Sequence, residues 1–166
     1  MTDSELSKAL AELDEQKVST LVRKRIGSGV DAMSVIKELQ EGMDTLGTVK
    51  GDIHNIGKDI VAVLLRASGF EVYDLSVDVP PTVFVNKLIE TRAPILGMSG
   101  LLTPAFESMK ETVKAVEAAG LRNKVKIIIG GGVVTELVKK HAGADAFTTD
   151  AVEGVEMCKQ FAKGAK

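Results

Sequence analysis

From about residue 45 onward, short segments typical of β-strands alternate with longer segments that have the apolar spacing of helices. Such alternation predicts a parallel sheet with helices on both faces, because parallel neighbours need a crossover connection. With five strands and right-handed crossovers, we expect a doubly wound α/β fold of strand order 2-1-3-4-5. The expected strands are 45–49, 71–75, 95–99, 125–129 and 146–148, and the expected helices are 57–68, 82–92, 105–119, 134–142 and 151–163.

The first of these strands fits its place poorly. In the expected order it lies at the centre of the sheet, where a strand is buried on both faces and forms a continuous apolar run. Segment 126–129 has that character, whereas 44–49, Asp-Thr-Leu-Gly-Thr-Val, offers only Leu46 and Val49. We therefore expect an underbuilt strand at the sheet centre.

The first 43 residues have helical spacing throughout, in three short amphipathic segments. The second segment is expected to begin at Asp14 and to end near Gly27. We therefore divide the chain into a helical domain, 1–44, and a sheet domain, 45–166.

Composition excludes several classes of protein. An apolar content of 45% in 166 residues indicates a packed globule. The net charge of -2 gives no electrostatic case for binding nucleic acid or a membrane surface. The single cysteine, Cys158, excludes an internal disulfide and a site of several thiolates, and its helical surroundings predict a buried position. No signal peptide or membrane-spanning run is visible, so we expect a soluble, cytoplasmic protein.

The loop after the first expected strand carries Asp52-Ile-His54-Asn-Ile-Gly57. A carboxylate two residues before an imidazole can hydrogen-bond one ring nitrogen, which fixes the tautomer and raises the basicity of the other. Gly57 lets the backbone come close to a bulky ligand as the next helix begins. These features favour His54 as a metal ligand, although such a string also occurs in ordinary turns and helix caps.

Further unusual segments follow the later strands. Because ligands of such folds bind at the carboxyl ends of the strands, these segments and the His54 loop are expected at one edge of the sheet. Taken singly, each has an ordinary interpretation as a turn or helix cap, and the glycines also suit a phosphate-binding loop without any metal. The segments are Ser99-Gly-Leu101-Leu-Thr103, Gly130-Gly131-Gly132 and Thr149-Asp150.

Together, Asp-x-His-x-x-Gly, Ser-x-Leu and Gly-Gly, in this order, resemble the signature of the cobalamin-binding domain of methyltransferase corrinoid proteins, to which methionine synthase is related. The resemblance implies a flavodoxin-like sheet domain after a small all-α domain. It also implies cobalamin (methylcobalamin and cob(I)alamin) bound base-off/His-on, with His54 as the lower axial ligand of cobalt. The implied cofactor-binding residues are Asp52, His54, Asn55, Ile56, Gly57, Ser99, Leu101, Thr103, Gly130, Gly131 and Asp150.

The resemblance also implies where the cofactor's detached nucleotide tail lies. It would run down a slot between strands one and three, lined by small residues that let the backbone approach a thick ligand. No residue is expected to be catalytic beyond the cofactor. We further hypothesise that Asp52 stabilises the ligating imidazole and shares the proton that His54 gains when it leaves cobalt.

The implied function is that of a corrinoid methyl carrier. One substrate-specific methyltransferase would load a methyl group onto cobalt, a second would pass it to tetrahydrofolate or a thiol, and a reductive activase would be a further partner. The chain alone would be a non-catalytic subunit. An alternative is the small subunit of an adenosylcobalamin-dependent mutase, against which the N-terminal helices argue. A DNA-binding regulator or a metal-free receiver-type domain fits the residues less well.

The chain departs from the family pattern at three places. Ala105 replaces a second serine of methionine synthase, so a side-chain relay from that position is absent. Asn55 replaces the usual aspartate after the histidine. The helical domain is much shorter than the four-helix domain of the family. Between Gly42 and Thr48 the chain therefore has either a true deletion or a junction of two segments across omitted residues.

Overall fold

The computed structural model describes residues 15–29 and 42–164. The first and third helices expected in the N-terminal part lie outside these residues. The second is present as α2, Glu15–Gly27, and it ends where the sequence predicted. Lys24 and Arg25 lie in its last turn, where positive charges interact favourably with the negative end of the helix dipole.

Five parallel strands form one sheet of order β2-β1-β3-β4-β5, which confirms the predicted topology. The strands are β1 (Gly42–Thr48), β2 (Phe70–Asp74), β3 (Ile95–Ser99), β4 (Lys126–Gly130) and β5 (Ala146–Thr148). The helices are α4 (Ile56–Ala67), α5 (Pro81–Thr91), α6 (Thr103–Ala118), α7 (Glu136–Ala142) and α8 (Ala151–Gly164). Each expected element of this part is confirmed to within three residues at either end.

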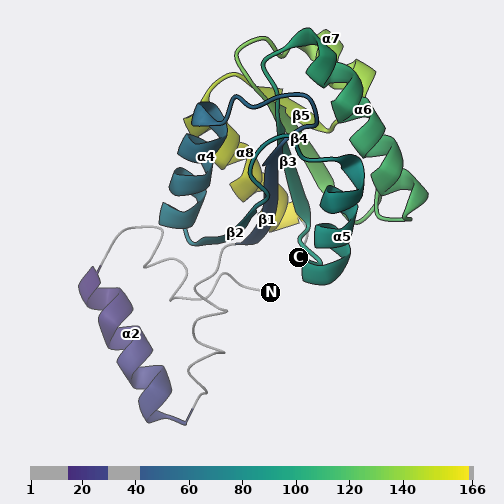
Figure 1. The fold of residues 1–166 in the computed structure, drawn as a ribbon. Helices are drawn as coiled ribbons and strands as arrows, with labels where there is room; N and C mark the ends of the chain where they lie inside the picture. Colours follow the sequence, from purple (N-terminus) through teal and green to yellow (C-terminus); the bar gives the residue numbers. More distant parts are fainter. Residues whose placement is uncertain (1–14, 30–41, 165–166) are drawn as a thin grey trace.

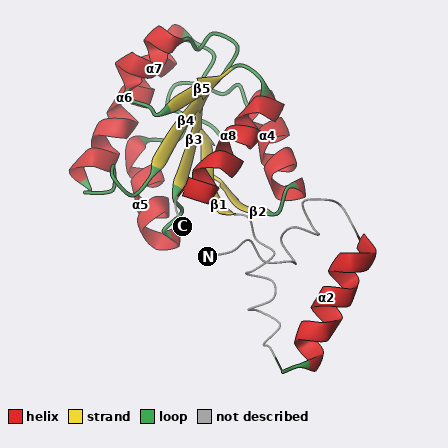
Figure 2. Cartoon of the chain, turned by 180° about the vertical axis from the view of Figure 1, so that it is seen from behind, coloured by secondary structure: helices red, strands yellow, loops and turns green. Residues whose placement is uncertain are grey.

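The helices cover the two faces of the sheet unequally. Figures 1 and 2 show α4 and α8 on one face and α5, α6 and α7 on the other. Under α5, α6 and α7 lies a large cluster of buried side chains that includes Phe84, Met109 and Ile127. Under α4 and α8 lies a smaller cluster that includes Leu65 and Ile128. Ile127 and Ile128 face opposite ways because neighbouring residues of a strand alternate.

The strand expected to be weak, β1, is an interior strand, second in the sheet order. β1 pairs with β2 and β3 and runs without interruption from Gly42, three residues before the expected start of the sheet domain at 45. Asp44 and Thr45 are therefore buried inside the sheet, with exposed fractions of 2% and 0%. Their side-chain oxygens have no hydrogen-bond partner. Beyond Thr48, a single bridge between Val49 and Val79 extends the pairing.

The described residues include no helix long and apolar enough to cross a membrane.

Candidate functional site

The loop after β1 brings Asp52 and His54 into direct contact. Asp52 is fully buried, and its Oδ1 lies 2.7 Å from Nδ1 of His54 and accepts the backbone N–H of His54 at 2.9 Å. The other oxygen, Oδ2, accepts the backbone N–H groups of Leu101 at 2.5 Å and Leu102 at 3.1 Å. The contact that the motif predicted is therefore present. The same carboxylate also joins the loops that follow β1 and β3.

These contacts determine the ionisation of Asp52. Burial by itself would raise its pKa. The hydrogen bonds from the backbone of His54, from Leu101, from the His54 side chain and from Leu102 outweigh burial, and they lower the pKa from 3.8 to about 2. An ionised carboxylate only accepts hydrogen bonds, so the neutral ring of His54 carries its proton on Nδ1. Nε2 is then left with a free lone pair.

A second loop supports the motif from the other side. Asp78, in the segment after β2, accepts the backbone N–H of Gly51 on Oδ1 at 2.7 Å. Its own N–H donates to the carbonyl oxygen of Asp52 at 3.0 Å. Asp78 has a φ of 52°, a strained backbone conformation for a residue other than glycine. Sequence reasoning assigned it no role, because nothing in the local pattern shows that segments 50–52 and 76–79 meet.

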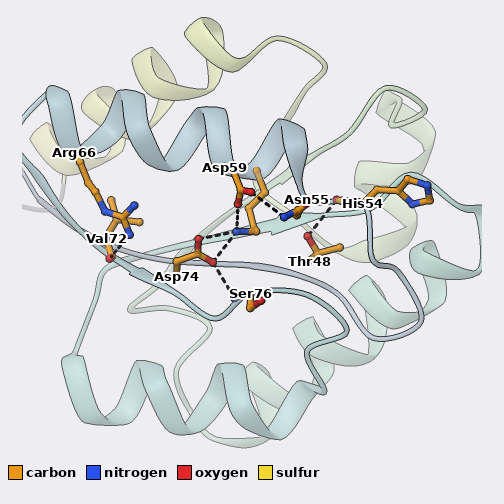
Figure 3. Close-up of polar contacts among 9 residues, drawn as sticks. Thr48, His54, Asn55, Asp59, Arg66, Val72, Asp74 and Ser76 are labelled. Atoms are coloured by element: carbon orange, nitrogen blue, oxygen red, sulfur yellow. Dashed lines mark hydrogen bonds and ion pairs between the residues drawn. The ribbon is translucent and has the colours of Figure 1, made fainter.

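The His54 ring is half exposed at the sheet edge, with a side-chain exposure of 49%. Figure 3 shows it projecting away from Asn55 and the first turn of α4. Large apolar side chains are exposed in the same loops that hold the ring. They are Ile53, Leu101 and Leu102, and Ile56 is exposed beside them at the start of α4. Exposed apolar groups collected at one place mark a binding surface more often than isolated ones do.

A cavity of about 270 Å³ opens between α4 and α8, and we call it the slot. It lies over β1, β3 and β4, on the face of the sheet that α4 and α8 cover, so the first and third strands that the resemblance named both line it. Five expected site residues line it, namely Gly57, Ser99, Gly130, Gly131 and Asp150. A volume of this size exceeds by far the space that one water molecule fills, so the slot is large enough for part of an organic ligand.

Glycines make room for the slot and for the loops at its mouth. A Cβ atom at Gly131, where φ is 139°, would lie 2.0 Å from the carbonyl oxygen of Gly100, so only glycine fits there. Within β3, a Cβ atom at Gly97 would lie 2.6 Å from Cδ1 of Leu46. Both Gly97 and Leu46 line the slot. Sequence reasoning did not select Gly97, although its place between Ile95 and Ser99 on one face of the strand was a signal for it.

Polar contacts tie the first turn of α4 to the end of β2. Lys58 donates to Asp59 and to both carboxylate oxygens of Asp74, and the backbone N–H of Ser76 donates to Asp74 at 2.8 Å. Figure 3 shows this network beside the bond from Asn55 to Asp59, which measures 2.8 Å. In that bond Asn55 is the donor. An aspartate at position 55, as in the family pattern, could not make it and would repel Asp59 instead.

The remaining expected residues have varied positions. Asp150 accepts the N–H of Glu153 at 2.9 Å in the first turn of α8, so it acts as a helix cap at the mouth of the slot. Thr103 is exposed at the start of α6 and does not line the slot. Ala105 is fully buried beneath Gly100, so no hydroxyl group lies at that position to extend the contact between Asp52 and His54.

Comparison with known proteins identifies the family. Residues 42–156 match the B12 binding domain. The chain is 38% identical over 123 residues to dimethylamine corrinoid protein 1 of Methanosarcina mazei, which covers 74% of this chain and 57% of that protein. A crystal structure of a cobalamin-binding protein from Desulfitobacterium hafniense DCB-2 covers 97% of this chain and 98% of its own, with a TM-score of 0.71 and 34% identity. The structure of Methanosarcina barkeri monomethylamine corrinoid protein shares the fold, with a TM-score of 0.70, 21% identity and coverage of 95% and 96%.

This chain belongs to the B12-binding domain family, and it is a cobalamin-binding corrinoid protein. It spans 57% of the length of the Methanosarcina mazei protein.

Proposed function

We propose that this protein is a methyl carrier that holds cobalamin base-off, with His54 as the lower axial ligand of cobalt. The observation that carries the proposal is the pairing of a fully buried, ionised Asp52 with Nδ1 of His54, because it directs the free lone pair on Nε2 to a ligand. The names of the curated relatives, which include dimethylamine corrinoid protein 1, support it.

The residues present fit this cofactor. The exposed side chains of Ile53, Ile56 and Leu102 lie in the loops around His54 and suit the flat face of a macrocycle. The slot takes the nucleotide tail, since Gly57, Gly130 and Gly131 have no side chains to narrow it at these three positions. Held by His54, the cofactor would supply the methyl-transfer chemistry, and the protein would supply position and electrostatics.

In this proposal the protein holds the imidazole ring of His54 in place. Asp52 fixes the orientation and tautomer of His54, and the N–H groups of Leu101 and Leu102 fix Asp52. The loops after β1 and β3 are thereby tied through one carboxylate. A change in the position of either loop is transmitted to the imidazole.

The proposal includes three partners. A methyltransferase that acts on a small methylated donor, for which the name of the relative suggests a methylamine, would load the carrier. A second methyltransferase would take the methyl group to tetrahydrofolate or a thiol. A reductive activase would restore an oxidised cofactor.

The test is the absorption spectrum of the chain reconstituted with methylcobalamin and, separately, with adenosylcobalamin. We expect methylcobalamin to be bound with the spectrum of histidine-ligated, base-off cobalamin, and His54→Ala to lose that spectrum. His141→Ala is the matched control, because His141 is the other of the two histidines and its Nε2 lies 2.5 Å from Oε1 of Glu107 on α6.

Two results would contradict the proposal. The first is an unaltered spectrum in His54→Ala, which would exclude ligation by that ring. The second is a marked preference for adenosylcobalamin, which would favour the small subunit of a mutase.

A further inference from the structure

One residue that lines the slot has a buried side chain without a partner. Asp44 lines the slot, its exposed fraction is 2%, and neither carboxyl oxygen has a hydrogen-bond partner. The thiol of Cys158, which lines the slot as well, lowers the pKa of Asp44 but is only a weak donor. Buried polar groups without partners are costly and rare in folded proteins. An unsatisfied carboxyl that lines a cavity therefore points to a ligand.

The depth of Asp44 is given by the strand register. Thr48 pairs with Ser99 at the sheet edge, and Asp44 pairs with Ile95 further down. With a rise of about 3.3 Å per residue, four residues place Asp44 about 13 Å below Thr48. The carboxyl group thus lies at the deep end of the slot, far from His54.

Polarity changes along the slot in the same direction. Its mouth is lined by Ser99, Thr149 and Asp150 and by glycine backbone, which suit phosphate and ribose. Below the mouth it is lined by Ile128, level with Gly97, and then by Ile95, level with Asp44, and these apolar side chains suit a flat aromatic base. In a nucleotide tail that enters from the edge, the base is the last unit. It therefore arrives next to Asp44.

We propose that Asp44 recognises this base through a hydrogen bond to its ring nitrogen, and so selects corrinoids with a nitrogen-containing lower base over those with a phenolic lower group. The inference rests on the proposed base-off binding, because only a base displaced from cobalt has a free ring nitrogen. Burial raises the pKa of Asp44 from 3.8 to about 7. Near neutral pH a large share of the carboxyl groups is therefore protonated and can donate to the ring nitrogen.

The experiment compares two probes on the same apoprotein. Cobalamin carries 5,6-dimethylbenzimidazole, whereas p-cresolyl cobamide carries a phenolic group without nitrogen. The dissociation constant of each, in the same cobalt oxidation state, is measured by spectral titration of the wild type, Asp44→Leu and Asp44→Asn. We expect Asp44→Leu to reduce the preference for cobalamin about tenfold, the effect of one hydrogen bond. Asp44→Asn keeps an N–H donor and should retain most of the preference.

Thr45→Val is the matched control. Thr45 is the next residue of β1, it is equally buried, and its hydroxyl is also unpartnered, but it does not line the slot. Its variant should leave the ratio of the two dissociation constants unchanged. An unchanged ratio in Asp44→Leu would overturn the inference alone. Failure of the wild type to bind either corrinoid would overturn the proposed function, and this inference with it.

Discussion

The ammonium group of Lys58 is buried between two carboxylates that are closer to water. Its Nζ lies 2.7 Å from both oxygens of Asp74 and 2.6 Å from Oδ1 of Asp59. The side-chain exposure is 2% for Lys58, 26% for Asp74 and 48% for Asp59. Burial would raise the pKa of Asp74, but the hydrogen bonds from Lys58 and Ser76 outweigh it and lower that pKa. The ion pair of Lys58 and Asp74 is therefore asymmetric, because the cation is buried and the carboxylate is partly exposed to water.

This asymmetry predicts that removing Asp74 and removing Lys58 lower the free energy of unfolding by different amounts. Asp74→Ala leaves a buried charge with only one carboxylate, and should cost about 3 kcal/mol of unfolding free energy. Lys58→Met leaves two carboxylates that water can reach, and should cost about 1 kcal/mol. Urea unfolding of the two apoproteins measures both values. A larger loss in Lys58→Met would show that water does not reach Asp74 as its exposure indicates.

Asp44 predicts a pH dependence of stability in the apoprotein. Its pKa in the folded chain is about 7 against 3.8 for a free carboxyl, so the folded state favours the protonated form. Ionisation of the buried carboxyl therefore lowers the free energy of unfolding. This loss of stability is absent below pH 3.8, grows as pH rises towards 7 and is complete above pH 7. The difference corresponds to about 4 kcal/mol. Asp44→Leu should remove this slope, and its stability relative to the wild type should therefore increase between pH 5 and about pH 8.

The pH range of that measurement matters, because Asp52 behaves in the opposite way. Its pKa is lowered to about 2, so its contribution to stability is present above pH 3.8 and is lost as pH falls towards 2. Denaturant unfolding above pH 5 therefore isolates the effect of Asp44. Parallel pH profiles of wild type and Asp44→Leu would contradict the prediction.

Two neighbouring glycines should respond differently to substitution. Gly131→Ala places a Cβ atom 2.0 Å from the Gly100 carbonyl oxygen at a φ of 139°, and should lower stability by about 2 kcal/mol or more. At Gly130 a Cβ atom meets only the Thr148 carbonyl oxygen, at 3.7 Å. Gly130→Val should therefore fold but fill the slot, and weaken cobalamin binding at least about tenfold. Thermal unfolding and spectral titration of both variants separate the two effects.

Asp52→Asn should loosen the His54 loop without emptying the site. An asparagine side chain keeps one acceptor oxygen, so N–H groups on one side of the former carboxylate lose their partner. We expect a loss of about 2 kcal/mol in the apoprotein. Cobalamin should still bind, with an altered cob(II)/cob(I) reduction potential and an altered pH dependence of that potential. An unchanged potential would refute the hypothesis that Asp52 stabilises the ligating imidazole.

The sheet was predictable because its signal is local. Apolar runs and turn residues place β3 and β5 at their observed bounds. The start of β1 was predicted three residues late, because Asp44 and Thr45 are polar and mark a loop in any local pattern. Their inclusion in the strand follows from pairing with β2 and β3, which sequence spacing does not reveal.

The motifs of the site were predictable from the sequence, whereas the residues that hold the motif loops in place were less so. The spacing of Asp52 and His54 predicted their contact, and the glycines after β4 were expected at the slot. Lys58 and Asp78 were missed, because each acts through a partner more than fifteen residues away. Thr103 is exposed at the start of α6, and its role as a cofactor-binding residue stays a prediction.

The slot also affects how stable the apoprotein is against degradation in a cell. α4 and α8 pack over a hollow, so the apoprotein folds around missing contacts that a bound tail would restore. A ligand that binds only the native state stabilises it by about 2.7 kcal/mol at a hundredfold excess over its Kd. Proteases act on opened chains, and this stabilisation lowers the fraction of opened chains about a hundredfold. The abundance of this protein would then follow the supply of its cofactor without any genetic regulator.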